Sequence, residues 1–558
     1  MRIFLVFLTE VFSMAESLAD EVRNAQFGDQ RLGKRLGIIA DRLAAKPNMS
    51  IPAAMNGRAE MEAAYRFFDN SKVTPEAILK PHVAATYQRV QQNDVVLLVQ
   101  DTTELDLTRP EQQVSGAGPI ECESRRGAFH HPLVAFDTNG LPLGTVWSKS
   151  WTREQIQTEL TAEEKRKLRR EAPIEEKESI RWLEGVRAAR EVAERSPQTK
   201  CVCVADSEAD IYELLAEPRT TQHEGELHLL LRGCQKRALS GHQGCMIEAV
   251  RATSCLMMYS LDVSRRKPKT SVETRKRRTQ RDARIAEVEV RATTITLRPP
   301  PRPDRKLPEV TINIVLVEEP NPPDGQTPIQ WMLITTLPIE TTEQVKEIVA
   351  YYCVRWQIEV YFRTLKSGCR IESRYFERLG RLLNCVAVYS IVAWKVLYLC
   401  RLSRECPDLD CEVVFAPSEW KSVYMAVRNA KPPAKPPTLN EITRMVASLG
   451  GYVIRKSTHP GTQTLWFGLQ RLHDLSTAWK SFGPDSEPPD TLSSKATCVV
   501  RPGHRPGLMC LAPLGQKELA NAQQSGAVQL VHFPGEVSER LGLCGDFGLF
   551  AGICHVRS

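Results

Sequence analysis

Two short apolar runs, each ended by an aspartate, constrain the fold of this 558-residue chain most strongly. Residues 95–99 (VVLLV) lead through one glutamine to Asp101, and residues 201–205 (CVCVA) lead directly to Asp206. Continuous apolar runs of this length are typical of strands that are covered on both faces, as in a sheet between layers of helices. The sequence therefore predicts an α/β fold with both aspartates at the edge of a buried sheet. In such folds ligands bind at the carboxyl ends of the strands.

The amino-terminal region has a different pattern. Leu32, Leu36, Ile39 and Leu43 recur at helical spacing, and the neighbouring cations, Arg31, Lys34, Arg35 and Arg42, occupy other faces. This spacing predicts a small helical unit with a cationic surface. The net charge of +7 permits contact with a polyanion but does not require it.

Alternating polarity dominates from about residue 226 to residue 338, where residues 286–290, 310–316 and 331–333 indicate strands. We expect a β-rich insertion there. Within it, residues 264–284 hold ten Lys and Arg side chains against one Glu and one Asp. This run is either a solvated loop or an arm that follows phosphate groups. A helix is expected at residues 207–217.

Residues 352–366 (YCVRWQIEVYFRTLK) carry the most informative pattern. At about 100° per helical residue, Tyr352, Arg355, Glu359 and Lys366 fall on one stripe roughly 60° wide. The opposite face is apolar and is expected to pack on the core; it consists of Val354, Ile358, Tyr361 and Leu365. A surface ion pair would also explain Arg355 and Glu359, which are four residues apart.

Three carboxylates therefore stand out: Asp101 and Asp206 at strand ends and Glu359 on a helix. Singly, each aspartate could merely cap the turn that follows it. Together they offer hard oxygen ligands of the kind that Mg²⁺ prefers, and a pair of such ions can promote in-line displacement at phosphorus. A phosphatase with an aspartate nucleophile is disfavoured, because no second aspartate follows Asp101 two residues later.

The same residues resemble the DDE transposases of the insertion-sequence-four family, to which the transposon-five enzyme belongs. The resemblance rests on Asp101-Thr-Thr, on residues 205–211 (ADSEADI) and on the spacing Tyr-x2-Arg-x3-Glu-x6-Lys that begins at Tyr352. It extends from about residue 18 to residue 480. It implies an RNase H-like mixed-sheet core with a β-strand insertion, flanked by an amino-terminal helical DNA-binding unit and a carboxy-terminal helical region.

The expected units are 14–85 (helical, DNA-binding), 86–225 (first part of the catalytic core), 226–340 (β-rich insertion), 341–402 (second part of the core, with Glu359), 403–483 (helical, dimerisation) and 484–558 (accessory tail). The resemblance implies that Asp101, Asp206 and Glu359 are the catalytic acids and bind two divalent ions, Mg²⁺ or alternatively Mn²⁺. The implied DNA contacts are Tyr352, Arg355, Lys366 and Trp331, with Arg31, Lys34 and Arg35 on the terminal repeats. Trp331 resembles an aromatic that stacks on a flipped base, although a core tryptophan is the other interpretation.

The implied activity is cut-and-paste transposition through a DNA hairpin, by a homodimer on double-stranded DNA in the bacterial cytoplasm, at the nucleoid. Two alternatives remain open: an inhibitor that binds transposon ends without cutting, and another RNase H-like nuclease. No membrane association is expected. Residues 382–400 are long and apolar enough to suggest a span, but Asn384 and Lys395 interrupt them and predict a buried core helix.

Overall fold

The computed structural model describes residues 17–484, except 110–112, 121–123, 155–160, 162, 165–167, 169–170, 221–226, 242–243, 264, 266–280 and 456–457, together with the paired strands β12 (Val499–Val500) and β13 (Gln529–Leu530). Most of the basic run 264–284 and the expected accessory tail therefore lie outside the described residues. Residues 1–479 and 480–558 form separate compact units, and the first contains every element below except β12, β13 and the end of the last helix.

The core of the sheet consists of three parallel strands, β1 (Val95–Gln100), β6 (Lys200–Ala205) and β7 (His228–Arg232). The two apolar runs form β1 and β6 as predicted, and all but the first residue of each is buried. Antiparallel strands complete the first half: β2 (Thr103–Asp106), β3 (Gly118–Pro119), β4 (Arg126–Phe136) and β5 (Pro142–Trp151). This mixed sheet with flanking helices agrees with the predicted RNase H-like fold class.

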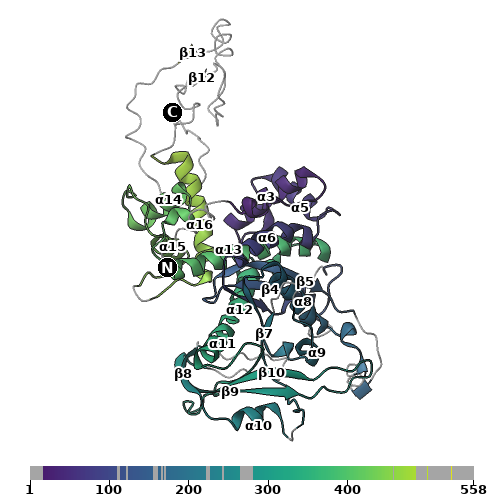
Figure 1. Ribbon diagram of the computed structural model, residues 1–558. Coiled ribbons are helices and arrows are strands. Elements are labelled where there is room, and N and C mark those ends of the chain that lie inside the picture. Colours follow the sequence, from purple (N-terminus) through teal and green to yellow (C-terminus); the bar gives the residue numbers. More distant parts are fainter. Residues whose placement is uncertain are drawn as a thin grey trace. The chain divides into compact units, whose positions relative to one another are not determined.

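The strands of the expected insertion extend the same sheet, and Figure 1 shows the long strands of this part side by side. They are β8 (Met257–Val263), β9 (Arg284–Leu297), β10 (Val310–Glu318) and β11 (Gln330–Thr335), and helix α10 (Met246–Arg251) lies beside them. The connection is the antiparallel pairing of β11 with β7, so the main path of the sheet runs β2-β4-β1-β6-β7-β11-β10-β9-β8, and β3 and β5 pair with β4 beside this path. The first strand in the range 226–340, β7, is a parallel neighbour of β6.

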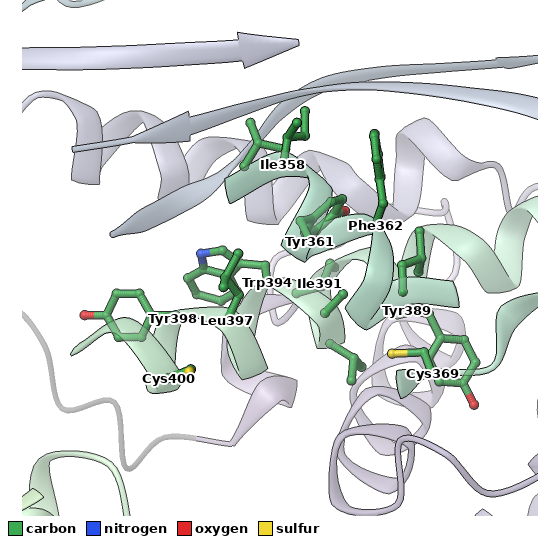
Figure 2. Packing of buried hydrophobic residues seen from close by; sticks show 14 of the residues in the cluster. Ile358, Tyr361, Phe362, Cys369, Tyr389, Ile391, Trp394, Leu397, Tyr398 and Cys400 are labelled. Atoms are coloured by element: carbon green, nitrogen blue, oxygen red, sulfur yellow. The ribbon is translucent and has the colours of Figure 1, made fainter. Parts of the chain in front are cut away.

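Helices cover both faces of the sheet. On one face, α8 (Ile180–Arg195) buries Trp182 and Val186 in a cluster with Val96 and Cys203. On the other, α12 (Trp356–Arg363) packs on α13 (Leu379–Glu405), and Figure 2 shows side chains of both helices, among them Ile358, Tyr361 and Trp394, in one buried cluster. The predicted apolar face of the Glu359 helix is therefore correct: all four of its residues are buried.

The helix that carries Glu359 is interrupted, which differs from the prediction of one continuous helix. Helix α11 (Thr342–Val354) ends before Arg355, α12 follows, and residues Thr364–Gly368 form a π-helical turn. The π turn widens the helix locally, so Lys366 leaves the straight stripe predicted from 100° per residue. The predicted helix over 207–217 is also wrong, since a 3₁₀ turn (Ser207–Ala209) precedes the four-residue helix α9 (Tyr212–Leu215).

The amino-terminal unit is helical, as expected, and consists of α2 (Leu18–Glu21), α3 (Gln30–Ala45), α4 (Ile51–Ala54), α5 (Arg58–Phe68) and α6 (Pro75–Val90). A buried polar network joins it to the sheet. Glu21 accepts from His82 Nδ1 at 2.5 Å and from Arg89 Nη2 at 2.7 Å. His82 Nε2 in turn accepts from the backbone N–H of Thr145 at 3.0 Å, and Arg89 Nε donates to the Leu143 carbonyl at 2.6 Å.

In the described part of the carboxy-terminal region, a 3₁₀ turn (Cys411–Val413) and three α-helices follow α13: α14 (Pro417–Arg428), α15 (Leu439–Leu449) and α16 (Thr462–Phe482). Helices α15 and α16 approach so closely that a β-carbon at Gly468 would lie 1.9 Å from the carbonyl oxygen of Val446, which only glycine avoids.

Among the described residues, one helix, α13, has the length and composition of a membrane span, but 89% of its most apolar window is buried inside the protein. Asn384 on this helix donates to the carbonyls of Phe68 and Val73 at 3.0 and 2.9 Å, so α13 is bound to the amino-terminal helices. This agrees with the predicted core helix at residues 382–400.

Candidate functional site

The two aspartates meet at one edge of the sheet. Strands β1 and β6 are parallel and in register, with Val99 opposite Val204, so Asp101 and Asp206 follow their carboxyl ends side by side. Glu359 on α12 reaches the same edge, since Arg355 contacts both it and Asp101. The opposite face of α12 packs on α13, and the Glu359 side chain stays 43% exposed. The fold therefore brings the three acids of the sequence prediction to one place.

Arg355 links two of these acids directly. Its Nη1 lies 3.0 Å from Asp101 Oδ2, and its Nη2 lies 3.8 Å from Glu359 Oε1. Only 12% of the Arg355 side chain is exposed. The ion pair expected within the helix is present, but the closer partner is Asp101, which is 254 positions away in the sequence.

The site carries an excess of negative charge. Burial, together with the negative charges of Asp206 and Glu359, raises the pKa of Asp101 to about 7 against the opposing effect of Arg355. Burial also raises the pKa of the neighbouring Tyr352 phenol. Three carboxylates with one guanidinium between them therefore favour the arrival of a further cation.

The donor set suits a hard divalent ion, since all three acids offer carboxylate oxygen. Within the described part of the chain, no three His, Cys, Asp or Glu side chains are grouped tightly enough to hold a metal as they stand. Arg355 lies between Asp101 and Glu359, so an ion bound to both would take over the place of its guanidinium. The residues fit such an ion in chemistry and charge, and they require Arg355 to move.

Each aspartate also has the local capping role considered from sequence. Asp101 Oδ1 accepts from the Thr102 N–H at 2.7 Å, and Asp206 Oδ1 accepts from the Glu208 N–H at 2.8 Å. These bonds use one oxygen of each carboxylate. The other oxygen of Asp101 faces Arg355, so capping and a role at the site are compatible.

A chain of hydrogen bonds beside the acids escaped the sequence analysis. Arg181 Nε donates to the Thr102 hydroxyl at 2.9 Å, and Arg181 Nη2 binds Glu208 at 2.9 Å. The Thr102 hydroxyl lies 2.8 Å from His131 Nδ1, and His131 Nε2 lies 3.0 Å from Gln100 Oε1. Because the amide oxygen of Gln100 can only accept, His131 carries its proton on Nε2 and Thr102 donates to Nδ1. Arg181 thus connects Thr102, which follows Asp101, with Glu208, which lies two residues after Asp206.

The other predicted residues of the helix stripe are more buried than expected. Tyr352 is 6% exposed and meets the half-buried Trp331 edge to face, with ring centroids 5.3 Å apart. Lys366 Nζ donates to the Glu104 carbonyl at 2.7 Å and pairs with Glu372 at 2.9 Å, so it ties the π turn to β2. The sequence analysis missed Trp356, which follows Arg355 and is 57% exposed.

The predicted cations of the amino-terminal unit belong to another surface. Arg31 and Lys34 are exposed on α3, and Arg35 is partly buried there. The Arg31 side chain is 94% exposed, and its backbone N–H donates to the helix cap Asp29 at 2.9 Å. The structure does not bring these three to the acids.

Three protein families match the chain. The family described as "Transposase DNA-binding" matches residues 14–73, "Transposase DDE domain" matches residues 185–384, and "Transposase Tn5 dimerisation domain" matches residues 391–479. The DDE match includes Asp206 and Glu359 and begins after Asp101. Among solved structures, the chain resembles a piggyBac transposase in a synaptic complex with hairpin DNA, at 11% identity and a TM-score of 0.33 over 72% of this chain and 76% of that one.

Proposed function

Because the chain belongs to the Tn5-like DDE transposases and is therefore a DNA transposase, we propose that it works by cut-and-paste. In this proposal it excises an element at its terminal inverted repeats and inserts the element into target DNA. The observation that carries the proposal is the meeting of Asp101, Asp206 and Glu359 at one sheet edge around a single arginine.

The three acids would hold two divalent ions, Mg²⁺ or alternatively Mn²⁺. When bound, such ions activate an attacking oxygen and stabilise the leaving oxygen at phosphorus. Arg355 would exchange its contact with Asp101 for a DNA phosphate, since a guanidinium binds phosphate through parallel hydrogen bonds. The network from Arg181 to Gln100 would keep the strand end that carries Asp101 in place during this exchange.

The proposed reaction has four phosphoryl transfers. Water attacks the phosphodiester at the element end and releases a 3′-hydroxyl. That hydroxyl attacks the opposite strand, which forms a hairpin and releases the flanking DNA. A second water opens the hairpin, and the regenerated 3′-hydroxyl attacks the target strand. Each step exchanges one P–O bond for another and needs no covalent link to the protein.

DNA contacts are proposed in two places. Arg355 and Tyr352 lie at the acids, and together with Lys366 they would contact phosphates at the cut end. Trp331 or the more exposed Trp356 would stack on an unpaired base. The exposed face of α3, with Arg31, Lys34 and Arg35, would grip the terminal repeat.

A homodimer would hold two DNA ends, since two cuts must be coordinated. The proposed dimerisation region, 403–483, has exposed apolar side chains that suit a protein contact: Met425, Val453, Ile454 and Phe467. We place the protein on nucleoid DNA in the bacterial cytoplasm.

The test is incubation of the purified protein with Mg²⁺ and DNA that carries the element's flanking inverted repeats. Wild-type protein and the control variant Glu343→Ala, an exposed carboxylate at the start of α11, are expected to give hairpin ends. Glu359→Ala is expected to bind the same DNA without cutting it. Nicking that persists in Glu359→Ala would show that Glu359 is not a catalytic acid. If the wild-type protein shifts the DNA in a gel without cutting it, the result would favour the alternative of an inhibitor that binds transposon ends.

A further inference from the structure

A pocket of about 540 Å³ lies beyond Asp206, outside the residues assigned above. Its walls come from four segments: 174–179, 210–213, 235–238 and 298–302. Strands β6 and β7 are parallel, with Ala205 opposite Leu231, so the chain leaves both strands at the same edge of the sheet. The segment after β6 therefore runs from Asp206 at the acids to Asp210 in the pocket wall within four residues.

A buried carboxylate fixes one wall. The Asp210 side chain is 0% exposed and accepts from the backbone N–H groups of Cys234 and Gln235, both at 2.7 Å. It also pairs with Arg237, whose Nε lies 2.9 Å away. These three contacts hold the loop after β7 in one conformation and leave the next side chain, Lys236, exposed at the pocket.

A second buried carboxylate holds the proline-rich segment of the wall, residues 298–302. The Glu213 side chain is 6% exposed and binds Arg302 Nε at 2.6 Å. Arg302 follows three consecutive prolines, residues 299–301, whose rings restrict the backbone. Arg298, at the start of this stiff segment, is exposed and lines the pocket.

The pocket has a surplus of positive charge. Asp210 and Glu213 are each neutralised by an arginine, which leaves Lys177, Lys236 and Arg298 in the lining. None of these three forms an ion pair with another residue that the structure describes. Among the described lining residues, Tyr212 is the one aromatic; it is 2% exposed and donates to the Pro308 carbonyl at 2.8 Å, so it offers no face on which a base could stack. Cations without an aromatic platform suit a phosphate and not a base.

We propose that this pocket binds a backbone phosphate of DNA as the strand leaves the catalytic acids, with Lys177, Lys236 and Arg298 as its contacts. The inference rests on the proposed function in so far as DNA lies at Asp206. It adds a second point of attachment on the same sheet edge, which would fix the direction of the duplex away from the cut.

The test measures DNA affinity without metal, in EDTA, over a range of salt concentrations by fluorescence anisotropy. Log affinity falls as log salt concentration rises. The triple variant Lys177→Ala/Lys236→Ala/Arg298→Ala is expected to make this fall less steep, by roughly 1 in the slope for each phosphate that the protein no longer neutralises. The charge-retaining variant Lys177→Arg/Lys236→Arg/Arg298→Lys should keep the slope. Lys200→Ala should keep it as well, because Lys200 begins β6 at the opposite end of the strand from Asp206.

Two DNAs identify the source of the phosphate. One is an element end with its flanking DNA, and the other is a pre-cut end joined to target DNA. If the triple variant shows a less steep salt dependence on either DNA, the result supports the proposed pocket and identifies the duplex that binds there. An unchanged slope on both, with a thermal transition like that of wild type, overturns the inference. Because no metal is present, this outcome is separate from loss of cutting in Glu359→Ala, which concerns the proposed chemistry alone.

Discussion

Replacing Glu21 by glutamine should loosen the amino-terminal helices from the sheet. Glu21 is the common partner of His82 and Arg89, and the three side chains are 13%, 0% and 6% exposed. Glutamine keeps the size of the side chain but removes the charge that Arg89 faces in a buried setting. Breaking a buried ion pair in this way costs about 3–5 kcal/mol.

The pKa of Glu21 gives a second measure of the same effect. Burial alone would raise this pKa, but the hydrogen bond with His82, followed by the charge and hydrogen bond of Arg89, outweighs burial and lowers it from 4.5 to about 2. A tenfold change in proton affinity is worth about 1.4 kcal/mol, so this lowering corresponds to roughly 3 kcal/mol. Since the folded pKa lies below the unfolded one, this stability is present above pH 4.5 and is lost as the pH falls towards 2.

The assay is amide hydrogen exchange in α3, which packs on the Glu21 helix. A loss of about 3 kcal/mol should speed exchange through opening of this unit about 100-fold at pH 7. The control is Glu62→Gln, which removes an exposed partner of Arg58 in the same unit and should change exchange little. If Glu21→Gln and Glu62→Gln exchange alike, the network does not hold the helices and the reasoning is wrong.

Two further predictions concern the site. Arg181→Met should lower the rate of cleavage about 10- to 100-fold and raise the Mg²⁺ concentration required, since it frees the residues after both aspartates. The control Arg187→Met removes an ion pair with Glu217 from the same helix and should leave cleavage unchanged. Equal losses of cleavage in the two variants would contradict a positioning role for Arg181. Trp356→Ala should weaken the binding of element-end DNA that carries an unpaired base by about 1–3 kcal/mol, because a stacking ring must be exposed. Trp331→Ala should weaken this binding by less. A DNA titration of both variants that gives the reverse order would contradict the assignment.

The positions of the two aspartates could be predicted from local sequence. Residues 95–99 and 201–205 are apolar without interruption, and such runs have few places in a fold other than a covered sheet. The apolar face of the Glu359 helix was predictable for a similar reason, because helical spacing decides which side chains share a face. In both cases the information lies within one element.

Contacts between distant elements could not be predicted in this way. The helix expected over 207–217 breaks because Asp210 binds the loop after β7. No pattern within residues 207–217 predicts that contact. Lys366 turns to Glu104 and Glu372 through a π turn, and Arg355 prefers Asp101 to the glutamate four residues away. Arg181 was missed because its partners, Thr102 and Glu208, are adjacent only after β1 and β6 have paired.

The central claim is that Asp101, Asp206 and Glu359 hold divalent ions at a DNA phosphodiester. Anomalous diffraction from crystals of the protein bound to element-end DNA and soaked in Mn²⁺ tests it directly. We predict manganese peaks about 2 Å from carboxylate oxygens of these acids, with Arg355 moved from Asp101 to a phosphate. Peaks only elsewhere, with the ion pair between Arg355 and Asp101 intact beside the bound DNA, would contradict the claim.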